Sequence, residues 1–453
     1  MSPSTTPTPY APSTLAIHAD DHLNQTTDVA PPIHLSTTYR YPSNPSALAP
    51  VPADTDPSAA ALLSPTAPLI YSRVAASNLN RLETLLAPLL FPAHAADPAA
   101  LSRLAVHVIT YASGLAAFHA LLVRLAPRVV ALSGGYHGIH GVVSLHARLH
   151  GLRTMDLHAS DAAWDAADLG PGDLVHLETP LNPTGEASSI AAFAARAHGR
   201  GALLSVDATF GPPGLQDPFA WGADVVMHSG TKYIGGHSDL LCGVLATTAV
   251  GEVGGRLAVG LRADRVFLGS VMGGLEGWLG VRSLRTLELR VGRQSQSAEE
   301  LVRWLDGCVN GGRAADQDAQ AEAEAKVVKR YVDRVQHASL QREDMGWLKQ
   351  QMPNGFGPVF AIWMRGPAAA RALPSKLKLF HHATSLGGVE SLIEWRRMSD
   401  HDVDERLLRV SVGVEDWRDL KADLAAGLRA LVEEGLLDGE SKEVQVRKNG
   451  SAA

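Results

Sequence analysis

Cysteine is nearly absent from this sequence, since Cys242 and Cys308 are the only two among 453 residues. Two cysteines cannot build a disulfide framework or a cysteine-based zinc site, and so low a number is typical of a reducing compartment. No lysine or arginine occurs before Arg40. A mitochondrial presequence needs a basic amphipathic helix, and the final Ser-Ala-Ala is no peroxisomal signal. We therefore expect a cytoplasmic protein.

Long apolar runs and long basic runs are missing as well. The longest nearly uncharged stretch, residues 239–252, is well short of a membrane span. Forty Lys and Arg stand against 47 Asp and Glu, which gives a formal net charge of -7 without the basic patch that nucleic-acid binding requires. The sequence therefore predicts small-molecule partners, with no nucleic acid and no membrane.

The composition is that of a globular α/β protein, with 45% apolar and 19% charged residues. Residues 1–61 are rich in Ser, Thr, Pro and Ala, and we expect an extended N-terminal arm there. Short apolar runs then alternate with helical patterns, which indicates a mostly parallel sheet in a large domain over residues 62–291. A smaller C-terminal α/β domain is expected over residues 292–453.

Individual elements follow from periodicity and from breakers. The expected strands of the large domain are residues 107–111, 128–132, 174–178, 202–207 and 223–228, and its expected helices include 115–125 and 188–198. A further helix is expected from Asn80 to near Pro88. In the C-terminal region we expect a helix over 284–304, a solvated insertion over 316–326, strands over 358–364 and 407–412, and a closing helix over 416–434.

Polar segments interrupt the expected strands at their carboxyl ends, where ligands bind in parallel α/β sheets. Gly114 follows a strand and opens a helix, so it suits a phosphate, although a structural turn has the same pattern. Tyr136 lies in a Gly-rich loop and can cap a flat cofactor or simply pack. Asn182 stands in a Pro-bracketed loop that is either a polar contact or a plain turn.

The last two segments carry charged residues. Asp207 ends an otherwise apolar strand, and a buried carboxylate needs a cation or strong donors. Lys232 follows the next strand among hydroxyls and glycines, and such a lysine can act as an amine nucleophile. A phosphate turn, an aromatic cap, a buried acid and a strand-end lysine together favour pyridoxal 5'-phosphate (PLP), which needs a Schiff-base lysine and a pyridinium partner.

A set of motifs occurs along the chain in the order Tyr71-Ser72-Arg73, Ala112-Ser113-Gly114, Tyr136, Glu178-Thr179-Pro180-Leu181-Asn182-Pro183, Val206-Asp207-Ala208-Thr209-Phe210, Ser229-Gly230-Thr231-Lys232, Ser385-Leu386-Gly387-Gly388 and Arg409-Val410-Ser411-Val412-Gly413. This order resembles the Cys/Met-metabolism PLP-dependent enzymes of trans-sulfuration, which include cystathionine γ-synthase and the cystathionine lyases. The resemblance extends from about Leu15 to about Leu431. It implies PLP-dependent transferase fold type I, which is aspartate-aminotransferase-like, with a large mostly parallel-sheet domain and a smaller C-terminal α/β domain.

The resemblance also implies a role for each site residue. Lys232 would bind the cofactor covalently, Asp207 would pair with the pyridinium nitrogen, and Tyr136 would stack on the ring and share proton transfers. Arg409 would clamp the substrate carboxylate. The other cofactor contacts would come from Ser113, Gly114, Leu115, Asn182, Ser229, Thr231, Tyr71 and Arg73, and Ser385 with Asn182 would support the substrate. Tyr71 and Arg73 would reach the phosphate of a neighbouring subunit, within a homotetramer built as a dimer of dimers whose active sites are shared across a dimer.

The implied function is carbon–sulfur lyase chemistry on cystathionine or a related sulfur amino acid, by α,γ- or α,β-elimination. The alternative is γ-replacement on a homoserine ester, the γ-synthase reaction. Thr384 stands where cystathionine enzymes often carry Glu, so the resemblance leaves the exact substrate open. Residues 394–397 read Glu-Trp-Arg-Arg, where the family usually has a Pro-containing segment.

Other classes of function fit the sequence less well. A catalytically silent homologue is a further alternative, against which the intact Lys232, Asp207 and Arg409 argue. A dinucleotide-binding oxidoreductase would need a Gly-x-Gly-x-x-Gly turn, which is not found after the first strand. The 19 histidines are spaced irregularly, so we expect no metal site.

Overall fold

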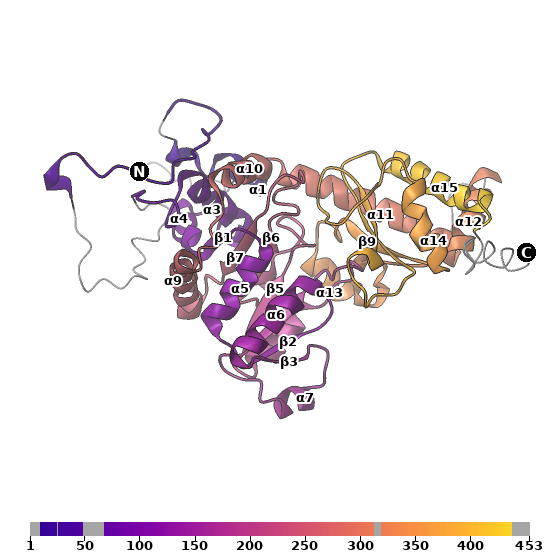
Figure 1. Cartoon of the computed structure of the whole chain (residues 1–453), viewed down its shortest axis with the longest axis horizontal. Coiled ribbons are helices and arrows are strands. Elements are labelled where there is room, and N and C mark those ends of the chain that lie inside the picture. Colours follow the sequence, from indigo (N-terminus) through magenta and orange to yellow (C-terminus); the bar gives the residue numbers. More distant parts are fainter. Residues whose placement is uncertain (1–9, 25, 49–67, 312–318, 437–453) are drawn as a thin grey trace, which may run out of the picture. The chain divides into compact units, whose positions relative to one another are not determined.

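The computed structural model describes residues 10–24, 26–48, 68–311 and 319–436 (Figure 1). The chain forms two compact units. Described residues within 1–179, 189–289 and 350–353 form the first unit, and described residues within 180–188, 290–349 and 354–453 form the second. The units divide after Leu289, close to the expected boundary after residue 291, but the assignment of 180–188 to the second unit had no local sequence signal.

A seven-stranded sheet forms the core of the first unit, in the order β1-β7-β6-β5-β4-β2-β3. Only β7 runs antiparallel to its neighbours, β1 and β6. The strands are β1 (Val108–Tyr111), β2 (Val129–Leu132), β3 (Arg153–Asp156), β4 (Leu174–Glu178), β5 (Leu203–Asp207), β6 (Val225–Ser229) and β7 (Gly243–Thr247). The expected strands of this domain are confirmed with small shifts of their ends, and β3 and β7 were not expected.

Helices pack on the sheet of the first unit, and α5 lies against both α6 and α9 (Figure 1). Apolar side chains of α5 such as Phe118 and Leu121 join Ile109 of β1 and Leu245 of β7 in one buried cluster. The helices are α1 (Pro12–His18), α3 (Ser77–Leu90), α4 (Pro98–Leu104), α5 (Gly114–Leu125), α6 (His137–His150), α7 (Asp161–Ala166), α8 (Ile190–His198), α9 (Gly251–Leu268) and α10 (Gly274–Leu284).

Two expectations for the N-terminal region are wrong. The arm is not extended throughout, because α1 forms within it and buries Leu15 and Ala16. Residues 49–61 of the expected arm lie outside the described residues. Helix α3 does not end near Pro88 but continues to Leu90, with Pro88 itself buried. Burial of its apolar side chains outweighs the lost hydrogen bond that proline imposes.

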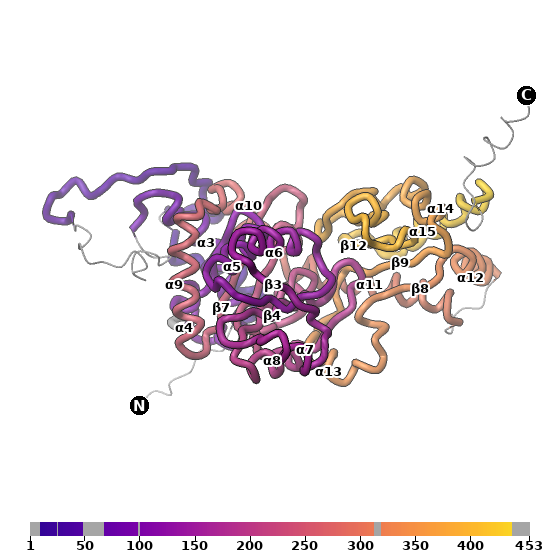
Figure 2. Tube along the Cα trace, turned by 60° about the horizontal axis from the view of Figure 1, so that its bottom comes forward, coloured from indigo at the N-terminus to yellow at the C-terminus, as the bar shows by residue number. Residues whose placement is uncertain are grey.

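The second unit contains a five-stranded sheet in the order β10-β11-β12-β9-β8. Its strands are β8 (Val332–Gln336), β9 (Val359–Met364), β10 (His381–His382), β11 (Leu392–Trp395) and β12 (Leu407–Ser411). Its helices are α11 (Leu287–Asn310), α12 (Ala319–Tyr331), α13 (Met345–Gln351), α14 (Pro367–Ala372) and α15 (Trp417–Glu433). The first residues of α11 and the last residues of α13 belong to the first unit. Helices α12 and α15 lie side by side (Figure 2). The expected strands near 358 and 407 and the closing helix are confirmed.

The helix expected over 284–304 is confirmed as α11 with shifted ends, since α11 begins at Leu287 and continues to Asn310, while Leu284 is the last residue of α10. One other expectation for this region is wrong. The expected insertion belongs instead to α12 from Ala319 onward, while residues 316–318 lie outside the described residues. No helix within the described ranges is long and apolar enough to cross a membrane.

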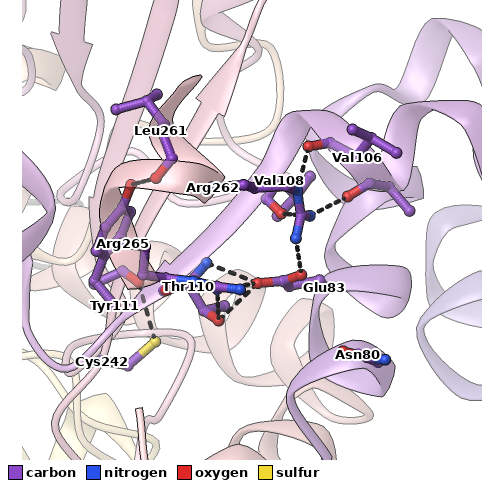
Figure 3. Close-up of polar contacts among 12 residues, drawn as sticks. Asn80, Glu83, Val106, Val108, Thr110, Tyr111, Cys242, Leu261, Arg262 and Arg265 are labelled. Atoms are coloured by element: carbon purple, nitrogen blue, oxygen red, sulfur yellow. Dashed lines mark hydrogen bonds and ion pairs between the residues drawn. The ribbon is translucent and has the colours of Figure 1, made fainter. Parts of the chain in front are cut away.

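A buried ion-pair cluster joins α3, β1 and α9 of the first unit (Figure 3). Glu83 contacts Arg262 at 2.9 Å and Arg265 at 2.8 Å, and all three side chains are buried. One Glu83 oxygen also accepts hydrogen bonds from the N–H and the hydroxyl of Thr110. Because β1 is an edge strand, Glu83 and Arg265 supply the partners that a neighbouring strand would give to the N–H and C=O of Thr110.

Buried histidines predict that the fold loses stability in mild acid. Burial lowers the pKa of His176 to about 3 and that of His228 to about 4. Both stay neutral in the folded protein near pH 5, whereas the unfolded chain takes up protons below its pKa of about 6.5. The free energy of unfolding is therefore highest above a pH of about 6.5 and decreases as the pH falls below it, by about 2 kcal/mol per histidine between pH 7 and pH 5.

Urea unfolding at both pH values measures this loss. A His176→Asn variant should show a smaller difference between pH 7 and pH 5 than the parent protein. His401→Asn is the matched control, because the side chain of His401 is 90% exposed. An equal pH dependence in the parent and both variants would contradict the assignment.

Candidate active site

Asp207 lies at the carboxyl end of β5 and is only 5% exposed. Its Oδ1 accepts hydrogen bonds from the N–H of Thr209 at 3.0 Å and from the hydroxyl of Thr209 at 2.5 Å. Burial raises the pKa of Asp207, and the two bonds from Thr209 only partly oppose that effect. A cationic donor against this carboxylate would favour its charged form, which is what a protonated pyridine nitrogen supplies.

The same threonine joins Asp207 to the neighbouring strand β6. Its Oγ1 accepts a hydrogen bond from the N–H of Ser229 at 2.8 Å. Ser229 ends β6, and the turn that begins there carries Lys232. Thr209 therefore fixes the distance between the acidic strand end and the lysine-bearing turn. Thr209 belongs to the motif at the end of β5, but its sequence context carries no signal for this linking role.

Lys232 lies in a turn that backbone hydrogen bonds hold closed. Its N–H donates to the carbonyl of Ser229 at 3.0 Å, and its own carbonyl accepts from Gly236 at 2.7 Å. The hydroxyl of Thr231 bonds to both the N–H and the carbonyl of Cys242, so it ties the turn to the segment that leads into β7. Lys232 is also the only lysine among the first 325 residues of the chain.

The N-terminus of α5 forms a cradle beside Ser229. Ser113 caps this helix by accepting from the N–H of Ala116 at 3.1 Å. A Cβ at Gly114 would lie 3.1 Å from the Cβ of Ser229, a tight contact that glycine avoids, so the two segments approach closely here. The N–H groups of Gly114 and Leu115 belong to the first turn of the helix, where intrahelical acceptors are lacking. This geometry suits a phosphate group.

Tyr136 occupies the N-cap position of α6, with its ring near Leu115 of α5, and is 40% exposed. Its N–H donates to Oε2 of Glu178 at 2.8 Å, and Glu178 ends β4 directly beside Asp207 in the register of β5. A Cβ at Gly138 would lie 2.5 Å from the Tyr136 ring and 3.0 Å from the side chain of Leu115. The ring therefore packs over the start of α6 next to the start of α5. Glu178 is therefore a second positioning residue, and its contact with Tyr136 could not be inferred from local sequence.

Tyr71 and Arg73 lie in the first unit on the segment before α3. Tyr71 is 43% exposed and forms an isolated bridge with Thr38. The guanidinium of Arg73 lies 5.5 Å from the centre of the Tyr71 ring, and its Nη1 donates to the carbonyl of Val266 at 3.4 Å. Their role toward the phosphate of a neighbouring subunit stays a prediction.

The second unit brings together Arg409, Asn182 and Ser385. Arg409 lies on β12 and is only 4% exposed. Its Nη1 donates to Oδ1 of Asn182 at 3.1 Å, and its Nη2 donates to the carbonyl of Ser385 at 2.7 Å. The same Nη2 lies 2.6 Å from a carboxylate oxygen of Glu394, its cross-strand partner on β11. A buried, oriented guanidinium of this kind suits recognition of a carboxylate.

Replacement of Thr209 by valine tests the link between the two strand ends. Valine keeps the shape but removes a donor to Asp207 and the acceptor for the N–H of Ser229. We expect a loss of about 1–3 kcal/mol of unfolding free energy, because both groups are left buried and less well satisfied. Thr209→Ser keeps the hydroxyl and should lose less in the same urea titration. Equal losses in the two variants would show that the hydroxyl contributes nothing.

Comparison with known proteins identifies a family and its relatives. Residues 13–429 match the sequence model of a family described as Cys/Met metabolism PLP-dependent enzyme. The chain is 30% identical over 437 residues to a cystathionine gamma-lyase of Saccharomyces cerevisiae, which covers 92% of this chain and 97% of that protein.

Solved structures agree in fold with the chain. A methionine gamma lyase from Micromonospora echinospora has a TM-score of 0.73 at 32% identity, covering 92% of this chain and 99% of that chain. A cystathionine gamma synthase from Xanthomonas oryzae pv. oryzae, in complex with cystathionine, has a TM-score of 0.72 at 26% identity, covering 93% of this chain and 98% of that chain. Both lyases and synthases are thus found among the proteins to which this chain is similar.

Proposed function

This chain belongs to the Cys/Met metabolism PLP-dependent enzymes, and from that premise we propose that it cleaves a carbon–sulfur bond of cystathionine or a related sulfur amino acid. The observation that carries the proposal is the pair of neighbouring strand ends in the first unit. There, one threonine side chain bonds both to the buried Asp207 and to Ser229, three residues before Lys232. A lysine and an acid held close to the ends of adjacent strands suit PLP, which needs a Schiff-base lysine and a partner for its ring nitrogen.

The residues of the first unit fit PLP on three counts. The cradle at Gly114, which a Cβ would fill, suits the phosphate. Asp207, whose pKa burial raises, suits a positively charged ring nitrogen. Tyr136 presents a half-exposed ring beside the start of α5. When bound, PLP supplies the electron sink that lets bonds at the Cα of an amino acid break.

Lys232 and Tyr136 are the groups that we propose move protons. The amine of Lys232 takes the proton from the Cα of the substrate. A sulfur leaving group at Cβ needs only this one proton removal, whereas a leaving group at Cγ needs a second removal at Cβ. The Tyr136 hydroxyl shares these transfers and returns a proton to the departing sulfur. In the second unit, Arg409 binds the substrate carboxylate, and Asn182 and Ser385 orient its guanidinium.

Product analysis of the PLP-loaded protein tests the proposal. Cystathionine, cysteine, methionine, and a homoserine ester with cysteine are supplied in separate reactions, and the amino-acid and keto-acid products are identified. We expect cystathionine to yield a keto acid together with a thiol amino acid. A protein that binds PLP but converts none of these compounds would be a silent homologue, and the proposal would fail.

The γ-replacement reaction is the second candidate. The similarity to a cystathionine gamma synthase over 93% of this chain supports it. Formation of cystathionine from the homoserine ester and cysteine, without release of keto acid, would establish this reaction in place of the lyase. Assembly as a homotetramer with shared active sites and a cytoplasmic location both stay predictions.

A further inference from the structure

A second arginine, Arg396, is buried next to the carboxylate partner of Arg409. Arg396 begins the turn that follows β11 and is 3% exposed, while Glu394 is 2% exposed. Nη1 of Arg396 lies 2.8 Å from Oε2 of Glu394, and Nη2 of Arg409 lies 2.6 Å from the same oxygen. The other carboxylate oxygen, Oε1, accepts from the hydroxyl of Ser399 at 2.7 Å. One oxygen of Glu394 is therefore shared by two guanidinium groups.

The net charge of this cluster determines how well Arg409 can attract a carboxylate. Burial raises the pKa of Glu394, but Arg409, Ser399 and Arg396 outweigh it, so the pKa is lowered and the carboxylate is charged. Two arginines and one glutamate leave a net charge of +1 among the three buried groups. Asp400 lies 3.9 Å from Arg396 and is nearer to solvent, which weakens its contribution.

Removal of Arg396 would change the pairing of Arg409. Glu394 would then neutralise Arg409 as a one-to-one ion pair, at a separation of 2.6 Å in a buried environment. A substrate carboxylate would have to compete with that pair. Nη1 of Arg396 donates a hydrogen bond to Glu394, whereas its Nε is buried without a hydrogen-bond partner in the described structure.

We propose that Arg396 is a positioning residue for carboxylate recognition. Because it pairs with the same oxygen of Glu394, it weakens the ion pair between Glu394 and Arg409 and so keeps Arg409 available to the carboxylate of an amino acid. This inference rests on the proposed function, in which Arg409 binds that carboxylate. It assigns to the Glu-Trp-Arg-Arg segment a part in substrate affinity, and it makes Glu394 the group that opposes binding when Arg396 is missing.

Binding of alanine and of alaninamide to the PLP-loaded protein tests the proposal without turnover. The two ligands differ in the carboxylate alone, and the visible spectrum of the bound cofactor reports their dissociation constants. Arg396→Gln should weaken alanine binding by about tenfold and alaninamide binding by less than about threefold, because the lost charge acts on the carboxylate. A general structural defect would weaken both ligands alike.

A second substitution should reverse the loss of alanine affinity. Adding Glu394→Gln to Arg396→Gln restores the net charge of +1 and should return alanine binding to within about threefold of the parent value, since the two residues act on one guanidinium. Arg397→Gln is the matched control, because this neighbouring arginine pairs at 3.2 Å with Glu405 at the surface. If Arg396→Gln does not fold, Arg396→Lys and the double variant serve in its place, with lysine expected to keep most of the alanine affinity.

The outcomes separate this inference from the proposed function. A protein that shows no PLP spectrum overturns both. If the parent protein distinguishes alanine from alaninamide and Arg409→Lys loses that distinction, the role of Arg409 is supported. In that case, equal effects of Arg396→Gln on the two ligands, or no recovery in the double variant, overturn the role of Arg396 alone.

Discussion

The Lys232→Ala variant is expected to lose covalent attachment of PLP and to turn over cystathionine at least about 10³-fold more slowly than the parent protein, because one amine both holds the cofactor and moves the proton. Borohydride reduction makes a lysine–PLP linkage permanent, so mass spectrometry of the digested protein locates it. Since no other lysine precedes residue 326, a label in the first unit identifies Lys232 without ambiguity.

Lys326→Ala provides the matched control for this experiment. Lys326 is the next lysine along the chain, lies on α12 and is exposed. Its replacement should leave the label, the visible absorption and turnover unchanged. A Lys232→Ala protein that retained the visible absorption after dialysis and still released keto acid would remove the basis of the proposed function.

The first-unit strands that lead into the proposed site were predictable because both of their faces are buried. Strands such as β4 and β6 read as short apolar runs, and each ends in polar residues that face the ligand side of a parallel sheet. Strand β3 has no such run, since Arg153–Asp156 is mostly exposed at the edge of the sheet. Strand β7 is buried as well, but Cys, Gly and Thr interrupt the apolar stretch around it, which weakens the local strand pattern.

Helices were predicted less well than the strands that lead into the site. The break between α10 and α11 coincides with Thr286, whose N–H and hydroxyl both bond to the carbonyl of Ser283. Such local bonding by threonine opposes helix continuation. Helix α12 was mistaken for an insertion because its composition is highly polar, yet Ala, Gln, Glu and Lys are all good helix formers.

Some residues of the candidate site could be predicted from local sequence, whereas others could not. The positions of Asp207 at the end of β5 and of Lys232 just after β6 were predictable, because each follows an apolar strand. Their roles in the site stay predictions. Thr209, Glu178 and Arg396 act through other residues, and their roles appear only when separate strands and turns are placed together. Thr209 bonds across to Ser229, and Glu178 holds the N–H of Tyr136 from a position 42 residues away in sequence.

Replacement of Glu83 by glutamine should destabilise the first unit by about 3–5 kcal/mol, because it leaves two buried guanidinium groups without their shared carboxylate. Arg262 and Arg265 both contact Glu83, and the N–H of Thr110 on β1 loses a charged acceptor as well (Figure 3). Urea unfolding followed by circular dichroism measures the loss. Since β1 leads directly into the turn at Gly114, weaker retention of PLP is expected to accompany it.

Glu252→Gln is the matched control, because it makes the same chemical change in an ion pair with Arg256 whose glutamate side chain is 89% exposed. Surface pairs of this kind contribute little, so its unfolding midpoint should stay close to that of the parent protein.

Acid unfolding supplies an independent check of the cluster. The two arginines hold the pKa of Glu83 below its usual value, so its stabilisation is complete above the unfolded pKa and disappears as the pH falls through the folded one. The Glu83→Gln protein should therefore lack this acid-induced loss, and an unchanged acid transition in that variant would show that the cluster does not stabilise β1.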